Sequence, residues 1–250
     1  MLSAISCDTC AIRHRALCGV LSAEEIQKIN AIAFRRTFAP NEMILNDRET
    51  PEFFGNIISG VVKLSKMMAD GRQQIVGLQF ASDFIGRPFA TRNPFFAEAA
   101  SEVVLCCFRK KQFEDLVREM PDLEHRMFQH TLDELDAARA WMVLLGRKSA
   151  EERIASFINL VVERAQASSG CRSDFMADSG AANLRIELPL TRAEIADYLG
   201  LTIETVSRQF TRLKSRGIID TAKGRQILVH DVGVLRDVAG EEDPVNLGID

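Results

Sequence analysis

The stretch of the chain that decides its fold is Thr191-Arg192-Ala193-Glu194-Ile195-Ala196-Asp197-Tyr198-Leu199-Gly200-Leu201-Thr202-Ile203-Glu204-Thr205-Val206-Ser207-Arg208-Gln209-Phe210-Thr211-Arg212-Leu213. Thr191 and Glu194 have the spacing of a capping box, in which each side chain accepts the other residue's backbone N–H at the start of a helix. Gly200 allows the backbone conformation of a tight turn, and Thr202 can cap a second helix. The stretch therefore predicts two short helices joined at Gly200, a helix-turn-helix.

The second predicted helix has an apolar face and a polar face. Val206, Phe210 and Leu213 recur at helical spacing, so we expect them to face the core. The polar side chains that we expect to face DNA are Thr202, Glu204, Thr205, Ser207, Arg208 and Arg212. A helical hairpin also occurs in ordinary protein cores, where the outward residues would form only a solvated surface. The segment that follows the hairpin favours the DNA-binding interpretation.

That segment, residues 218–229, predicts two short strands around a Lys223-Gly224-Arg225 turn, which is the wing of a winged helix-turn-helix. Residues 189–229 contain seven Lys and Arg against four Asp and Glu, although the whole chain has a formal net charge of -4. A local positive excess is what binding to DNA phosphates requires.

The length of 250 residues and a hydrophobic fraction of 46% predict two domains with substantial cores. No apolar run approaches the ~20 residues needed to cross a bilayer, and no signal peptide is recognisable. We therefore expect a cytoplasmic protein without membrane contact. In order, the predicted parts are a cysteine-rich segment (1–20), a β-roll (21–120), a dimerisation helix (121–146), a winged helix-turn-helix domain (147–238) and a flexible tail (239–250).

Residues 34–108 read as short strands separated by turn residues, with Asp70-Gly71 as a hairpin turn. The strands are expected at 43–45, 53–58, 61–67, 74–80 and 103–108. This pattern predicts an antiparallel roll and an α+β fold class. Phe89, Phe95 and Phe96 are expected to fill its core. Before the roll, a helix capped by Ser22 and Glu25 is expected to bury Ile26, Ile29 and Ala33.

A long helix is predicted from Asp122 to Leu145, because this stretch contains neither Gly nor Pro; Gly146 is expected to end it. Its apolar seam has coiled-coil spacing and consists of Phe128, Thr131, Leu135, Ala138, Met142 and Leu145. The seam predicts that two copies of the chain pair into a homodimer. The alternative is that the seam packs on the roll of its own chain.

Three of the six cysteines, Cys7, Cys10 and Cys18, form a C-x2-C-x7-C pattern near the N-terminus. Thiolates at such spacing suit iron–sulfur clusters and zinc. His14 would complete a C-x2-C-x3-H-x3-C set of four zinc ligands. Spacing alone leaves an iron–sulfur cluster, a zinc ion and three unligated thiols all open.

Taken in order, these parts resemble the cyclic-AMP receptor protein and fumarate-nitrate reduction regulator superfamily (CRP/FNR), and within it the oxygen-sensing FNR-type branch. The resemblance covers nearly the whole chain. Its specific matches are Ile57-Ile58-Ser59-Gly60-Val61-Val62-Lys63, Ala150-Glu151-Glu152-Arg153-Ile154-Ala155 and the E-x-x-S-R pattern within Leu201–Arg208. The resemblance implies a jelly roll of the cyclic-nucleotide-binding type and a DNA-binding regulator, not an enzyme.

The resemblance also implies a TTGAT-type inverted repeat in double-stranded DNA as the target. Arg208 would then donate to guanine, Glu204 would accept from the cytosine amine, and Ser207 would contact a thymine or adenine edge. These pairings agree with the donor and acceptor pattern of the bases in the major groove. Two paired recognition helices about 34 Å apart would reach successive major grooves.

For the cysteines, the resemblance implies a 4Fe-4S cluster held by Cys7, Cys10, Cys18 and Cys106. The spacing from Cys10 to Cys18 is wider by two residues than in the best-known members of the family. Cys107 is expected on the opposite face of its strand. The alternatives are a structural zinc site, or a regulator that responds to nitric oxide or through haem.

The residues that hold a cyclic phosphate in cyclic-AMP binders have no counterpart here. The corresponding segments are residues 82–89 and 96–100. The second segment has no arginine where cyclic-AMP binders have the phosphate-binding one, so we expect no response to cyclic nucleotides. The resemblance further implies that the loop from Asp83 to Arg87 contacts RNA polymerase. The expected mechanism is that an intact cluster, present at low oxygen, favours dimers and DNA binding.

Overall fold

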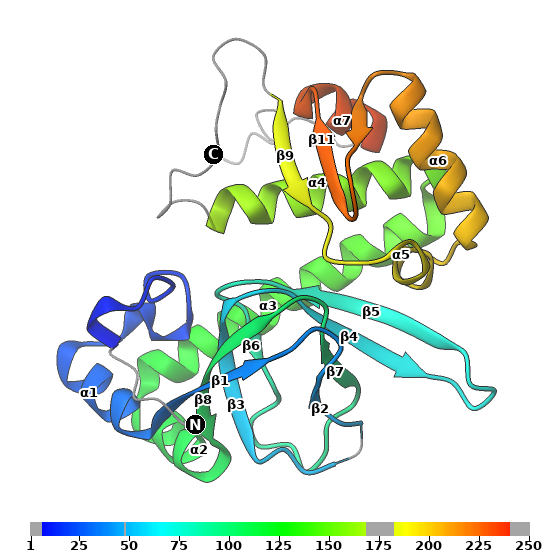
Figure 1. Cartoon of the computed structure of the whole chain (residues 1–250). Helices are drawn as coiled ribbons and strands as arrows, with labels where there is room; N and C mark the ends of the chain where they lie inside the picture. Colours follow the sequence, from blue (N-terminus) through cyan, green and yellow to red (C-terminus); the bar gives the residue numbers. More distant parts are fainter. Residues whose placement is uncertain (1–6, 48, 169–182, 241–250) are drawn as a thin grey trace. The chain divides into compact units, whose positions relative to one another are not determined.

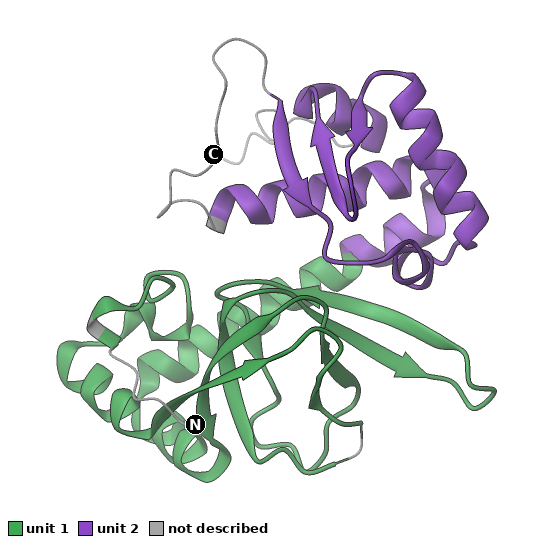
Figure 2. Cartoon of the chain, in the orientation of Figure 1, with its two compact units in different colours: residues 1–139 green, residues 140–250 purple. Residues whose placement is uncertain are grey.

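The computed structural model describes residues 7–47, 49–168 and 183–240 of the chain. They form two compact units, residues 1–139 and 140–250 (Figure 2). Most of residues 167–183 and most of the predicted flexible tail (239–250) lie outside the described residues. In the described part, no helix is both long and apolar enough to span a membrane.

The first unit begins with two short 3-10 turns, η1 (Cys7–Thr9) and η2 (Leu17–Val20), and the helix α1 (Ala23–Ile32). An antiparallel β-roll follows (Figure 1). Its strands are β1 (Ala33–Phe38), β2 (Met43–Leu45), β3 (Phe53–Ser59), β4 (Val62–Met67), β5 (Gln73–Gln79), β6 (Phe84–Ile85), β7 (Phe96–Ala99) and β8 (Val103–Arg109). They pair as two four-stranded sheets, in the orders β1-β8-β3-β6 and β2-β7-β4-β5.

The interior of the roll is filled by apolar side chains from both sheets. Its fully buried members include Phe38, Ile57, Val62, Ala97, Ala99, Val103, Leu105 and Cys107. The α+β roll predicted from the sequence is thus confirmed, and β2 has the predicted bounds. The capping box of Ser22 and Glu25 is present at the start of α1.

Three details of the roll were predicted wrongly. Ala33 begins β1 rather than ending the helix, and β1, β6 and β7 were not anticipated. No turn residue separates α1 from β1. Two consecutive exposed arginines, Arg35 and Arg36, also interrupt the alternation of apolar and polar residues by which a strand such as β1 is recognised. Phe89 was expected in the core, but it is 52% exposed and its backbone has a φ of 63°.

Two helices follow the roll, α2 (Lys110–Glu119) and α3 (Pro121–Arg147). The predicted stop at Gly146 is wrong, because α3 continues through it to Arg147. A single glycine costs a helix about 1 kcal/mol relative to alanine, which a helix of 27 residues tolerates.

The second unit contains α4 (Ala150–Ser168), which opens with a capping box between Ser149 and Glu152. The remaining elements are β9 (Leu184–Glu187), α5 (Arg192–Leu199), α6 (Ile203–Ser215), β10 (Ile219–Thr221), β11 (Gln226–Val229) and α7 (Val232–Ala239). The three strands pair in the order β10-β11-β9. This confirms the predicted winged helix-turn-helix, to which the structure adds α7.

One side chain, Arg153 of α4, joins the ends of two helices in this unit. Its guanidinium donates to the carbonyls of Leu145 (2.6 Å) and Lys148 (2.9 Å) at the end of α3 and to that of Leu199 (3.1 Å) at the end of α5. The last carbonyls of a helix have no hydrogen-bond partner within the helix. A guanidinium that donates to them therefore stabilises the ends of both α3 and α5. Beside it, the rings of Trp141 and Tyr198 stack with centroids 4.0 Å apart.

We expect Arg153→Met to lower the free energy of unfolding of the second unit by about 2–4 kcal/mol, since three carbonyls lose a charged donor. Urea denaturation followed by Trp141 fluorescence measures this. The matched control is Arg139→Met, which removes an exposed ion pair with Asp136 and should cost under about 0.5 kcal/mol. Equal effects of the two substitutions would contradict the role of Arg153.

Candidate nucleic-acid interface and cysteine site

The caps predicted for the helix-turn-helix are present atom by atom. Thr191 Oγ1 accepts the backbone N–H of Glu194 (3.3 Å), and the Glu194 carboxylate accepts the backbone N–H of Thr191 (2.8 Å). Gly200 has the left-handed conformation, with φ 62° and ψ 42°. Thr202 Oγ1 accepts the backbone N–H of Thr205 (3.2 Å) and so starts α6. These local contacts set the angle at which α6 leaves α5.

The helix α6 has the predicted two faces. Val206, Phe210 and Leu213 are buried, and the guanidinium of Arg192 lies over the ring of Phe210. On the other face, Thr202, Glu204, Ser207, Arg208 and Arg212 are exposed, and Thr205 is half-buried. The structure therefore brings the predicted base-reading side chains together on one exposed surface.

The electrostatics of this surface suit reading of base edges. The pKa of Glu204 lies below its ordinary value, because its carboxylate accepts its own backbone N–H and the Thr202 hydroxyl and lies near the charge of Arg208. Glu204 is therefore an ionised acceptor and Arg208 a donor, one turn apart. Carboxylate and guanidinium groups match cytosine and guanine in the major groove, respectively.

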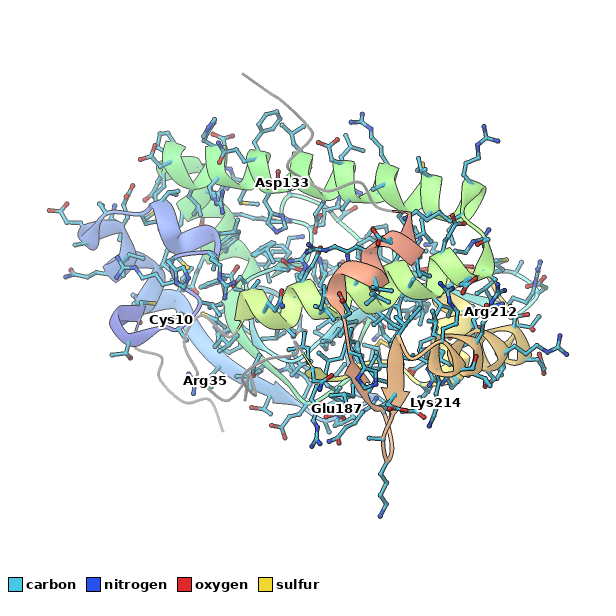
Figure 3. The ribbon with its side chains drawn as sticks, turned by 90° about the horizontal axis from the view of Figure 1, so that it is seen from above. Cys10, Arg35, Asp133, Glu187, Arg212 and Lys214 are labelled. Atoms are coloured by element: carbon cyan, nitrogen blue, oxygen red, sulfur yellow. The ribbon has the colours of Figure 1, made fainter. Side chains whose placement is uncertain are left out.

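Arg212, predicted to contact DNA, also has a partner within the protein. Its guanidinium lies 3.3 Å from the carboxylate of Glu151 in α4, which Arg216 contacts at 2.5 Å. Glu151 thus fastens the C-terminal end of α6 to α4. The sequence did not predict this link between α4 and α6. The presence of Glu151 in the family motif Ala150–Ala155 was the one feature that could have indicated it. Figure 3 labels Arg212 and Lys214 on α6.

The wing contributes further cations. The turn between β10 and β11 contains Gly224, with φ 76°, next to the exposed Lys223. At the base of the wing, Asp220 pairs with Lys214 of α6 (3.4 Å) and with His230 (3.1 Å). The wing is therefore attached to the end of the recognition helix.

The four predicted cluster ligands lie in one part of the first unit. Cys7, Cys18 and Cys106 are buried within a single apolar cluster. The half-buried Cys10, which Figure 3 labels, packs against it. Burial raises the pKa of Cys18 to about 11, and the neighbouring Cys10 and Cys7 add to this. Burial likewise raises the pKa of Cys106, followed by the effects of Cys18, Cys7 and Cys10. Such mutual effects require the four thiols to be near one another.

Cys107 faces the other way. It is fully buried in the interior of the roll, and burial raises its pKa to about 12. Adjacent residues of a strand point to opposite faces. Of the two cysteines in β8, only Cys106 therefore faces the N-terminal segment, as predicted.

A site for a single metal ion is not assembled in the part of the chain that the structure describes. There, no three His, Cys, Asp or Glu side chains are placed to hold one ion. His14, the fourth ligand of the possible zinc set, is exposed, whereas Cys7 and Cys18 are buried.

The N-terminal segment also contacts α3. Leu123 of α3 is buried in the same apolar cluster as the cysteines, and Met127 packs against it. The guanidinium of Arg126 donates to the carbonyl of Arg15 (3.4 Å). A change around the cysteines therefore has a direct physical route to the long helix.

The apolar seam of α3 is largely uncovered within one chain. Phe128 is 60% exposed, Leu135 44% and Met142 69%; Ala138 is exposed and Leu145 half-buried. Leu132 and Val143, which were not predicted, are 44% and 58% exposed. The alternative that the seam packs on the roll of its own chain is not what the structure shows.

Comparison with known proteins agrees with this geometry. The family model described as "Crp-like helix-turn-helix domain" matches residues 152–238, and the "Cyclic nucleotide-binding domain" model matches residues 35–120. A "Probable transcriptional activator" from Rhizobium leguminosarum bv. viciae is 42% identical over 92% of each chain. "Transcriptional activator protein FnrL" from Cereibacter sphaeroides is 38% identical and covers 97% of this chain and 95% of its own.

Solved structures show the same relationship. The structure of FixK2 from Bradyrhizobium japonicum is 28% identical, with a TM-score of 0.71, and covers 85% of this chain and 98% of that one. The relatives are transcription regulators, and the matching models span both units. This chain therefore belongs to the CRP/FNR superfamily and is a DNA-binding transcriptional regulator, not an enzyme.

Proposed function

We propose that this regulator responds to oxygen: it binds an inverted repeat of TTGAT-type half-sites as a homodimer while a 4Fe-4S cluster on Cys7, Cys10, Cys18 and Cys106 is intact. The observation that carries the proposal is the gathering of four thiols in one buried region that includes Leu123 of α3. When bound, the cluster supplies a link between four cysteines that oxygen can destroy.

The donor set fits a cluster better than a zinc ion. All four candidate ligands are thiols, and Cys7, Cys10, Cys18 and Cys106 would hold the cluster as its four thiolate ligands. Cys7, Cys18 and Cys106 lie in one apolar cluster with Cys10 packed against it, whereas His14, the non-cysteine ligand of the possible zinc set, is exposed.

The link from the cysteines to DNA runs through α3. With its cysteines tied together, the N-terminal segment is held against Leu123, Met127 and the guanidinium of Arg126. This contact favours the position of α3 in which the exposed seams of two copies pair. A bias of a few kcal/mol between monomer and dimer is enough to switch occupancy of a site.

A cyclic nucleotide is not part of this proposal, although the roll matches the cyclic nucleotide-binding family model. The interior of the roll is filled by the side chains of Phe38, Ile57 and Leu105, among others. Residues 96–100, which correspond to the segment that holds the phosphate in cyclic-AMP binders, contain no arginine.

We further propose that the segment Asp83–Arg87, which includes β6, contacts RNA polymerase together with the exposed Phe89 beside it. Reconstituted transcription with Phe89→Ala tests this: we expect less transcription and unchanged DNA binding.

We expect protein purified without air to be coloured and to contain about four iron and four sulfide ions per chain. Cys106→Ala should lose this content and its binding to the inverted repeat. The matched control is Cys107→Ala, which removes the neighbouring thiol on the other face of β8 and should keep both. Iron and sulfide assays, absorbance and a gel-shift titration measure these properties.

A colourless, iron-free protein that still binds its DNA site would contradict the assignment of a 4Fe-4S cluster. Stoichiometric zinc in that preparation would support the structural-zinc alternative, and haem absorbance would support a haem-based sensor. In either case the DNA-binding assignment stands, since it rests on α6 and the wing.

We expect Leu135→Glu to give monomers in sedimentation velocity at micromolar concentration, because it places a charge in the middle of the apolar seam. The loss of dimers should also abolish binding to a full inverted repeat. Asp133→Ala, on the same helix but off the seam, is the control (Figure 3). A Leu135→Glu protein that remains dimeric would refute the seam as the dimer contact.

We expect Arg208→Ala to weaken binding by about 1–3 kcal/mol and to abolish the preference for guanine at one position of each half-site. Lys214→Ala is the contrasting variant. It removes an exposed cation that would contact DNA phosphates, so it should weaken binding to all DNA sequences alike and lower the salt dependence of binding. Fluorescence anisotropy with single-base variants of the site distinguishes the two. Unchanged base preference in Arg208→Ala would count against the assignment.

A further inference from the structure

Asn56 is a buried amide next to the cysteines, and it is neither a candidate cluster ligand nor a DNA-contacting residue. It lies in β3 and is only 1% exposed. Its side-chain nitrogen Nδ2 donates a hydrogen bond to Sγ of Cys18, at 3.7 Å. The contact joins residues 38 positions apart in the chain, so it depends on the tertiary structure.

The register of the sheet directs Asn56 toward the cysteine site. Asn56 is the cross-strand partner of Cys106, and directly opposed residues of an antiparallel pair share one face. Strands β3 and β8 are neighbours in the roll (Figure 1). The preceding Gly55 permits close approach, because a Cβ there would lie 2.7 Å from the carbonyl oxygen of Cys106. Asn56 is thus placed between two of the four candidate ligands, Cys18 and Cys106.

The surroundings of Asn56 make a purely structural role costly. Its neighbours in the strand include Phe54 and Ile57, both fully buried. Asparagine is unfavourable in strands, and buried polar atoms normally have hydrogen-bond partners. Among the described residues its oxygen Oδ1 has none. A buried amide whose donor points at a sulfur is best explained when that sulfur carries negative charge, because hydrogen bonds to charged acceptors are the stronger ones.

We propose that Asn56 is a positioning residue of the cluster site, which donates a hydrogen bond to the ligand sulfur of Cys18 and slows destruction of the cluster by oxygen. This rests on the proposed function, namely a cluster held by the four cysteines. Hydrogen bonds to ligand sulfurs raise the reduction potential of an iron–sulfur cluster, because they stabilise its more negative state. Oxidation by dioxygen removes one electron from the cluster and reduces dioxygen to superoxide, so a higher potential opposes it.

The test uses the full chain purified without air and two substitutions at one position. Asn56→Leu keeps the branched shape of the side chain in a somewhat larger volume and removes the donor. Asn56→Ser leaves a hydroxyl on a side chain too short to reach the sulfur. Asn93→Leu is the matched control: it removes another buried amide of the roll, one that donates to the carbonyl of Asn46. Thermal unfolding of the iron-free proteins verifies that each variant folds.

We expect all four proteins, wild type included, to carry iron and sulfide. After exposure to air-saturated buffer, cluster absorbance should decay on the order of 10-fold faster in Asn56→Leu and Asn56→Ser than in wild type and Asn93→Leu. The cluster potential, measured by redox titration, should fall in the same two variants.

Equal decay rates and potentials in all four proteins would overturn the role of Asn56 and leave the proposed function intact. A wild-type protein without iron and sulfide would overturn both. If Asn56→Leu fails to fold, Asn56→Ser decides the question, because its smaller side chain introduces no clash.

Discussion

The structure depends on one apolar cluster in which the N-terminal segment, the roll and the long helix meet. Cys7 and Cys18 come from the segment, Cys106 from β8 and Leu123 from α3. In its described residues the segment forms the short turns η1 and η2, which are too brief to be stable alone. Burial favours the neutral form of the Cys18 and Cys106 thiols, because it raises the pKa of both groups. A bound metal group would displace those protons, so binding and the packing of the segment are coupled.

A second constraint acts at the DNA-reading end. The helices α5 and α6 are short, so tertiary contacts rather than helix propensity hold them. Glu151 fastens α6 to α4, and Arg153 joins the ends of α3 and α5 beside the turn at Gly200. The helix α3 therefore ends in the same hydrogen-bond network that contacts the end of α5 in the helix-turn-helix. This connection gives α3 a physical means to influence how the recognition helix is presented.

Between these two regions, α3 leaves Phe128, Leu132 and Leu135 exposed along one stripe. Water contact with so much apolar surface is unfavourable, and large exposed patches of this kind mark interaction sites. Positions 128, 135 and 142 are each seven residues apart, which is the heptad spacing that a coiled-coil seam requires. The same helix thus touches the cysteine region, offers a surface for pairing and meets the DNA-reading unit.

The sequence by itself determined the features that depend on near neighbours: the capping boxes at Ser22 and Thr191, the turn at Gly200, the two faces of α6 and the Asp70-Gly71 hairpin. Caps and turns are set by contacts within a few residues, so their residue types are diagnostic. Motifs resembling CRP/FNR regulators also identified the family. Only the tertiary structure decided the features that depend on packing between distant parts of the chain. They are the strand that begins at Ala33, the exposure of Phe89 and Leu132, and the hydrogen bonds from Arg153 to three carbonyls. The tertiary structure also placed Asn56 against Cys18. These features depend on residues far apart in the chain, so no local sequence pattern predicts them. Their stability comes from burial and from hydrogen bonds that form only when folding brings those residues together.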